Sequence, residues 1–177
     1  MNRKLKLWEL NRVSESEFKN QEKFPLIVVL DNIRSLNNIG SFFRTADAFN
    51  VEKIYLCGIT ATPPHRDIHK TALGATETIN WEHVESTVEL TKKLKSEGVT
   101  ICCIEQAEET TFLNEVSEFP INHKYALVFG NEVDGVDQDV IDLSDEIIEI
   151  PQFGTKHSLN VSVCAGVVLW EFTKRYI

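Results

Sequence analysis

The stretch Pro25-Leu26-Ile27-Val28-Val29-Leu30 decides the fold class of this chain. It is apolar at every position and rich in β-branched residues, as expected of a strand that is buried on both faces of a parallel sheet. Helical patterns alternate with further strand-like runs, which lie at residues 53–57, 77–84, 100–105, 125–130 and 146–150. This alternation predicts an α/β fold with a mainly parallel sheet and helices on both of its faces.

The chain is predicted to form a single domain, because 177 residues suffice for one hydrophobic core and no linker or repeat divides them. Residues 1–24 are expected to form a short helical arm, and residues 25–177 the domain itself. Neither an apolar run long enough to span a membrane nor a signal peptide is recognisable, so we expect a cytoplasmic protein.

The four cysteines give no sign of a metal site or a disulfide. Cys57, Cys102 and Cys103 fall in predicted strands and Cys164 in the last predicted helix, without CxxC or Cys/His metal spacing. We expect reduced, buried thiols that act as small hydrophobic side chains, and no bound metal.

The net charge of −9 is unusual for a protein that binds nucleic acid, because phosphate contacts depend on Lys and Arg. The acidic residues are concentrated, however: residues 131–149 contain eight of them and no Lys or Arg. The remaining cations gather at residues 3–6, 65–70, 156–157 and 174–175. They either form a locally positive face or are scattered solubilising charges, and the sequence leaves both interpretations open.

Two loops that follow predicted strands contain unusual polar residues. In the first, Asn38 is predicted to cap the next helix, Gly40 allows a close approach, and the donor fork of Arg44 suits a phosphate. In the second, Gly130 leaves room for a ligand at the strand end, and Glu132 is placed to hold a polar partner.

A third loop follows the last predicted strand. There Ser158 is predicted to cap a long helix that runs to about Lys174, and the unpaired N–H groups of such a helix start can hold a polar ligand. Because the carboxyl ends of parallel strands share one edge of a sheet, the three loops together predict one ligand site. Neither GxGxxG nor GxxxxGK[ST] occurs, which counts against a nicotinamide-binding oxidoreductase.

In order and spacing, the three loops resemble the three motifs of the SpoU/TrmH-type RNA 2′-O-methyltransferases of the SPOUT class. The resemblance extends from about Pro25 to Trp170. The matching segments are Asn38-Ile39-Gly40 with Arg44-Thr45-Ala46-Asp47-Ala48, then Leu127-Val128-Phe129-Gly130-Asn131-Glu132 with Gly135, and finally Ile150-Pro151 with Ser158-Leu159-Asn160-Val161-Ser162 and Ala165-Gly166.

This resemblance implies a C-terminal deep trefoil knot, a homodimer with the last helix and the first helix near its interface, and S-adenosyl-L-methionine as the methyl donor. The cofactor contacts that it implies are Ile104, Glu105, Gln106, Gly130, Ile150, Ser158 and Leu159. The residues that it links to catalysis are Arg44, Asn38, Glu132, Ser158 and Asn160. A guanidinium is effectively always protonated, so we expect Arg44 to clamp phosphate and ribose, and the base is left open.

RNA, either tRNA or rRNA, is the implied partner. The predicted RNA contacts are Arg34, Arg44, Arg66, Lys70 and Lys156, with support from the cationic arm (Arg3, Lys4, Lys6 and Arg12), which could instead contact a dimer partner. The alternative function is that of a knotted RNA-binding protein without catalysis. The presence of Asn38, Arg44, Glu132 and Asn160 argues against that alternative, because a degenerate copy would be expected to have lost some of them.

Overall fold

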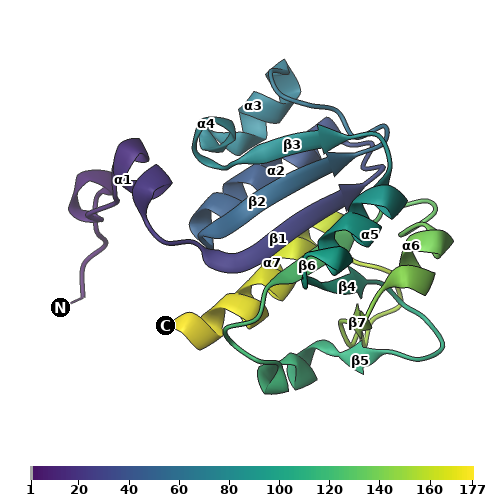
Figure 1. Cartoon of the computed structure of the whole chain (residues 1–177). Coiled ribbons are helices and arrows are strands. Elements are labelled where there is room, and N and C mark those ends of the chain that lie inside the picture. Colours follow the sequence, from purple (N-terminus) through teal and green to yellow (C-terminus); the bar gives the residue numbers. More distant parts are fainter. Residues whose placement is uncertain (1) are drawn as a thin grey trace.

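A single seven-stranded sheet forms the centre of the computed structural model, which describes residues 2–177 (Figure 1). The order is β3-β2-β1-β6-β4-β7-β5, and every neighbouring pair is parallel. The strands are β1 (Phe24–Asp31), β2 (Val51–Cys57), β3 (Trp81–Val84), β4 (Thr100–Ile104), β5 (Thr111–Phe112), β6 (Tyr125–Phe129) and β7 (Glu146–Glu149). The prediction of a mainly parallel α/β fold is confirmed.

Helices cover both faces of the sheet, as predicted. They are α1 (Glu15–Asn20), α2 (Leu36–Ala48), α3 (Arg66–Ala72), α4 (Ala75–Thr78), α5 (Thr87–Ser96), α6 (Gln138–Leu143) and α7 (Val161–Thr173). Short 3₁₀ helices occupy Leu7–Glu9, Leu113–Glu118 and Lys174–Tyr176. The predicted arm contains α1 and extends away from the sheet in Figure 1, while Met1 lies outside the described residues.

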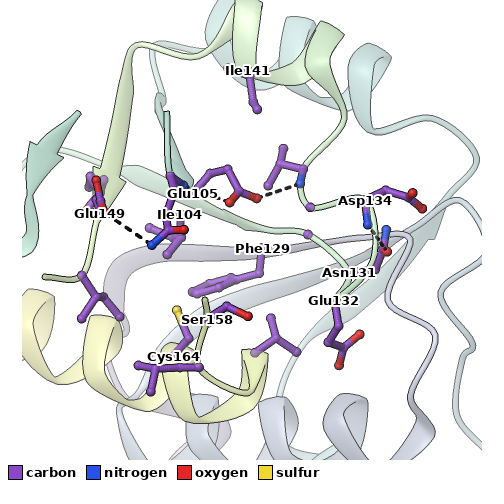
Figure 2. A pocket seen from close by; sticks show the side chains of 18 of the residues that line it. Ile104, Glu105, Phe129, Asn131, Glu132, Asp134, Ile141, Glu149, Ser158 and Cys164 are labelled. Carbon is purple, nitrogen blue, oxygen red and sulfur yellow. Dashed lines mark hydrogen bonds between the residues drawn. The ribbon is translucent and has the colours of Figure 1, made fainter. Parts of the chain in front are cut away.

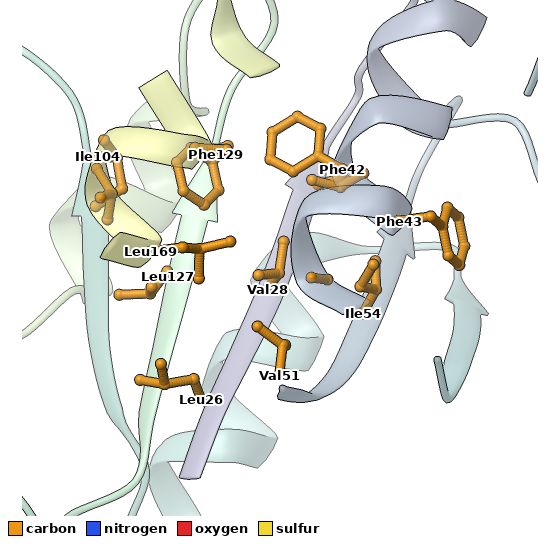
Figure 3. Close-up of a cluster of buried hydrophobic side chains, with 14 of the residues drawn as sticks. Leu26, Val28, Phe42, Phe43, Val51, Ile54, Ile104, Leu127, Phe129 and Leu169 are labelled. Atoms are coloured by element: carbon orange, nitrogen blue, oxygen red, sulfur yellow. The ribbon is translucent and has the colours of Figure 1, made fainter. Parts of the chain in front are cut away.

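Strand β1 shows how the two faces are packed, since its side chains alternate between two cores. Leu26 and Val28 belong to the larger cluster, in which α2 and α7 cover the sheet. Ile27 and Val29 belong to the smaller cluster, together with apolar side chains of α5 and α6. Figure 3 shows the larger cluster, where Phe42 of α2 lies edge-on to Phe129 of β6 at 5.2 Å between ring centroids.

Two predicted helix caps are wrong. Ser35, not Asn38, caps α2 by accepting the N–H of Asn38. Asn160, not Ser158, caps α7, because the Asn160 side-chain oxygen accepts the N–H groups of Ser162 and Val163. Ser158 therefore lies in the loop before the helix, and the helix begins two residues later than predicted.

Other differences from the predicted secondary structure arise from short helices and strands that were not predicted. The strand predicted over residues 77–84 is shortened to β3, because α4 occupies residues 75–78. Strand β5 and helix α6 were not predicted. All four cysteines are free thiols; Cys57, Cys102 and Cys103 are buried as expected, whereas Cys164 is half-buried. Within residues 2–177, the helices fall short of the length and apolar character that a membrane crossing requires.

Candidate active site

A pocket of about 460 Å³ opens at the carboxyl ends of β4, β6 and β7 (Figure 2). This is the edge of the sheet where parallel folds of this kind bind ligands. All seven residues that the resemblance implied as cofactor contacts line it, namely Ile104, Glu105, Gln106, Gly130, Ile150, Ser158 and Leu159. The structure thus brings the predicted set together, and its role in cofactor binding stays a prediction.

The loop after β6 forms a tightly folded wall of this pocket. The side-chain oxygen of Asn131 accepts the N–H groups of Val133 and Asp134, each at 3.0 Å, and Asn131 forms an isolated bridge with Gly135. A Cβ atom at Gly130 would overlap the backbone of Gly135 and Val136. Glycine at position 130 is therefore required by the folding of the loop itself.

The side chains of Glu105 and Asp31 hold this loop in place through hydrogen bonds to its backbone. Glu105 accepts the N–H of Gln106 at 2.9 Å and that of Val136 at 3.1 Å. Asp31, only 1% exposed, accepts the N–H of Asp137 at 2.9 Å and the hydroxyl of Thr87 at 2.5 Å. A buried carboxylate needs such donors, and these fix the loop to β1 and α5.

Three of the predicted catalytic residues form one hydrogen-bonded unit. The side-chain amide of Asn38 donates to Oε1 of Glu132, and the amide of Asn160 donates to Oδ1 of Asn38 at 3.2 Å. Asn160 also caps α7, so the unit ends on the positive N-terminal end of that helix. Glu132 and Ser158 both line the pocket, which places this unit at its rim.

Arg44 does not belong to this cluster, although it was predicted to act with it. Arg44 lies on α2 in a second groove of about 660 Å³, between the arm and α3–α4, which Arg12 also lines. Two residues six positions apart on a helix, such as Asn38 and Arg44, point in different directions. Within one chain, the structure therefore separates Arg44 from the other four predicted catalytic residues.

The predicted RNA contacts lie at several places on the surface. Arg66 and Lys70 are exposed on α3, and Lys156 is exposed in the loop before α7. Arg34 differs from them, because it forms an ion pair with Asp134 at 2.7 Å beside the pocket. Its charge is therefore partly neutralised at a position that was predicted to contact RNA.

Sequence reasoning missed several residues of the pocket, including Phe129, Glu149, Gln152 and Cys164. Burial, together with the nearby Glu105 carboxylate, raises the pKa of the Cys164 thiol to about 12. That thiol is consequently protonated and inert at neutral pH. Across the described part of the chain, no group of three or more His, Cys, Asp and Glu residues is arranged to hold a metal ion.

The chain is similar in sequence and in structure to known proteins. The family model described as the SpoU rRNA Methylase family matches residues 25–170. The 23S rRNA (guanosine-2′-O-)-methyltransferase RlmB of Neisseria meningitidis serogroup B is 31% identical, over 92% of this chain and 64% of that protein. The chain thus spans slightly less than two thirds of the length of this relative.

Two solved structures are similar over most of the chain. The TrmH/SpoU tRNA modifying enzyme of A. aeolicus has a TM-score of 0.78 at 27% identity, covering 91% of this chain and 79% of that one. The AdoMet-bound rRNA methyltransferase of Sinorhizobium meliloti has a TM-score of 0.81 at 24% identity, covering 88% and 58%, and shows the shared fold. On the match over residues 25–170, this chain belongs to the SpoU rRNA methylase family.

Proposed function

We propose that this chain transfers a methyl group from S-adenosylmethionine to a ribose 2′-hydroxyl of tRNA or rRNA in the cytoplasm. The observation that supports this most directly is the Glu132–Asn38–Asn160 unit at the rim of the pocket. Methyl transfer to a hydroxyl requires a methyl donor aligned with the oxygen and a group that accepts the proton. The pocket can hold the methyl donor, and the carboxylate of Glu132 can accept the proton.

The pocket has the size and lining that the cofactor needs. Its volume of about 460 Å³ lies within the range typical of small-molecule sites. Its walls combine apolar surface, such as Phe129 and Ile150, with polar groups, such as the hydroxyl of Ser158. The S. meliloti relative is described as AdoMet-bound, which supports the same ligand here.

When bound, S-adenosylmethionine supplies an electrophilic methyl group. The residues of the chain orient the hydroxyl and remove its proton. Asn38 holds the Glu132 carboxylate through Oε1, and Asn160 holds Asn38, so the three side chains form one preorganised unit. Glu132 is the ionisable member of these three, and we propose that its carboxylate accepts the proton of the 2′-hydroxyl. We propose that the hydroxyl of Ser158, which also lines the pocket, orients the ribose.

The separate position of Arg44 supports a homodimer as the active form. In a homodimer, Arg44 of one protomer can approach the pocket of the other, which it does not line in its own chain. Helix α7 offers a surface for such an interface, because Val163, Val167 and Trp170 are 54%, 41% and 51% exposed along one side of it. An apolar stripe of this kind is costly to leave in water.

We extend the proposal to the chain path and to the RNA surface. The segment between β7 and α7 is proposed to form the deep trefoil knot of the family. The packing of α7 beside α2 and the bond from Asn160 to Asn38 support this path. RNA is proposed to contact Arg66, Lys70 and Lys156, which are exposed, and the groove that Arg12 and Arg44 share. Arg34 is also proposed to contact RNA, and for this an RNA phosphate has to replace Asp134 as its ion-pair partner.

The direct test is transfer of labelled methyl groups from S-adenosylmethionine into RNA isolated from cells that lack this protein, followed by mass-spectrometric mapping. Label on a ribose 2′-oxygen is expected. Label on a base would contradict the chemistry proposed here. Binding of RNA and cofactor without transfer would instead favour a knotted RNA-binding protein without catalytic activity.

Arg44→Ala tests the role of the arginine. We expect transfer to be lost while the affinity for S-adenosylhomocysteine stays within a few-fold, because Arg44 does not line the pocket. Arg44→Lys is the matched variant: it keeps the charge but loses the two-pronged donor geometry, so it should restore little activity. A collapse of cofactor affinity in Arg44→Ala, measured by calorimetric titration, would show that the clamp role is wrong.

A further inference from the structure

Four carboxylates line the pocket, from Glu105, Glu132, Asp134 and Glu149. Figure 2 shows them distributed around its rim, on segments that follow or end three different strands. The described lining contains no Lys or Arg side chain. The charged side chains that line the pocket are therefore all negative. The ligand that we propose for it carries charged groups of its own.

Three of these carboxylates have only neutral hydrogen-bond donors. Glu105 accepts two backbone N–H groups, and Glu132 accepts the Asn38 amide. Glu149 accepts the Gln106 amide at 3.4 Å and the Thr110 hydroxyl at 3.1 Å. A neutral donor stabilises a carboxylate but leaves its charge in place, whereas the charge of Asp134 is offset by Arg34.

We propose that Glu105, Glu132 and Glu149 make the pocket selective for the sulfonium form of the cofactor over the thioether product. This inference rests on the proposed function, since it concerns the same site. S-adenosylmethionine and S-adenosylhomocysteine differ by one methyl group and one positive charge on sulfur. A site with uncompensated negative charge therefore favours the donor and weakens retention of the product once the methyl group has left.

The size of the effect follows from Coulomb's law in a half-solvated site. At a dielectric close to that of water, a single carboxylate that lies about 4–6 Å from the sulfur changes the affinity ratio of the two ligands about three- to tenfold. Ionic strength reduces the effect, because the pocket is open to solvent.

A different role for these carboxylates makes a different prediction. If they only hydrogen-bond the amino group or the ribose hydroxyls of the cofactor, they contact groups that both ligands share. Both affinities would then fall together when a carboxylate is removed. The ratio of the dissociation constants of S-adenosylmethionine and S-adenosylhomocysteine therefore distinguishes charge selectivity from contact with shared groups. Neither constant alone distinguishes the two.

The test is calorimetric titration of both ligands into the full chain and into Glu149→Gln. Glutamine preserves the shape of the side chain, and the partners of Glu149 are the side chains of Gln106 and Thr110. We expect the preference for S-adenosylmethionine to fall about three- to tenfold, with S-adenosylhomocysteine affinity nearly unchanged. Glu132→Gln, which keeps an acceptor for Asn38, should change the ratio in the same direction.

Glu97→Gln is the matched control. It removes the same charge from an exposed position at the end of α5, which leads into the amino end of β4, opposite the pocket. Its ratio should equal that of the unmodified chain. An unchanged ratio in both Glu149→Gln and Glu132→Gln, or an equal loss of both ligands, would overturn the inference. If the unmodified chain binds neither ligand, the proposed function itself fails.

Discussion

Asn160 links fold and chemistry at the scale of a single residue. Its side-chain oxygen caps α7, and its amide donates to Asn38, which holds Glu132. Asn160→Ala removes both functions, so we expect it to lower the free energy of unfolding by about 1–2 kcal/mol and to abolish methyl transfer. Urea denaturation and a labelled-methyl assay measure the two effects.

Asn160→Asp separates these two functions. Aspartate caps a helix as well as asparagine does, so the free energy of unfolding should stay within about 0.5 kcal/mol of that of the unmodified chain. It cannot donate to Asn38, and it adds a negative charge near Glu132, so transfer should still fall at least about tenfold. Full activity in Asn160→Asp would show that the bond to Asn38 has no role in orientation.

The prediction of Ser158 as the cap of α7 was wrong because Asn160, two residues later, is an equally good cap residue. The choice between the two depends on Asn38, which is 122 positions away along the chain and hydrogen-bonds Asn160. In contrast, the location of the pocket was predictable, because strand ends in a parallel sheet converge on one edge, whereas the seven predicted lining residues came from the family resemblance.

At the scale of helices and strands, Gly40 determines how closely α2 and α3 approach. A Cβ atom there would overlap the Thr71 side chain and the carbonyl oxygen of Ile68, and a carbonyl cannot rotate away as a side chain can. We expect Gly40→Ala to lower the free energy of unfolding by about 2 kcal/mol or more, measured by urea denaturation.

Gly154→Ala is the control for this prediction. Gly154 lies in the loop before α7, and a Cβ atom there meets no atom of the chain within 4 Å. Alanine should therefore leave the free energy of unfolding unchanged or raise it by up to about 1 kcal/mol, because it restricts the unfolded chain. A neutral Gly40→Ala would mean that α2 and α3 adjust their spacing without cost.

The long elements were predictable from the sequence, and the short ones were not. Strand β1 and helix α2 have apolar patterns extended enough to define their period. Strand β5 consists of Thr111 and Phe112 alone, and α6 lies within the most acidic segment of the chain, so neither has a recognisable pattern. Their positions follow from pairing with β7 and packing on β4, which are tertiary effects.

At the scale of the whole molecule, the position of Arg44 is what the sequence could not predict. The motif that contains Asn38 and Arg44 suggested one cluster, yet Asn38 hydrogen-bonds Glu132 at the rim of the pocket and Arg44 lines the second groove. The homodimer that we propose would reconcile the motif with the structure. Such an assembly requires an interface, and the exposed apolar stripe of α7 is the surface best suited to form it.

Val167→Glu tests this assembly, because it places a charge in the middle of the stripe, where Val167 is 41% exposed. We expect sedimentation analysis to show a shift from two chains to one of 20.2 kDa, since burying an unpaired carboxylate at an interface is costly. Ile59→Glu is the control, because Ile59 is a 67% exposed apolar residue in the loop after β2 and should leave the mass unchanged.

The activity of the Val167→Glu monomer then tests whether catalysis requires both chains. Its pocket is intact, so S-adenosylhomocysteine should bind with nearly unchanged affinity. If Arg44 acts on the pocket of the other protomer, methyl transfer should be lost together with the dimer. A monomer that retains full transfer would mean that Arg44 serves its own pocket after a movement of RNA or of α2. A variant that stays dimeric would instead place the interface on another surface.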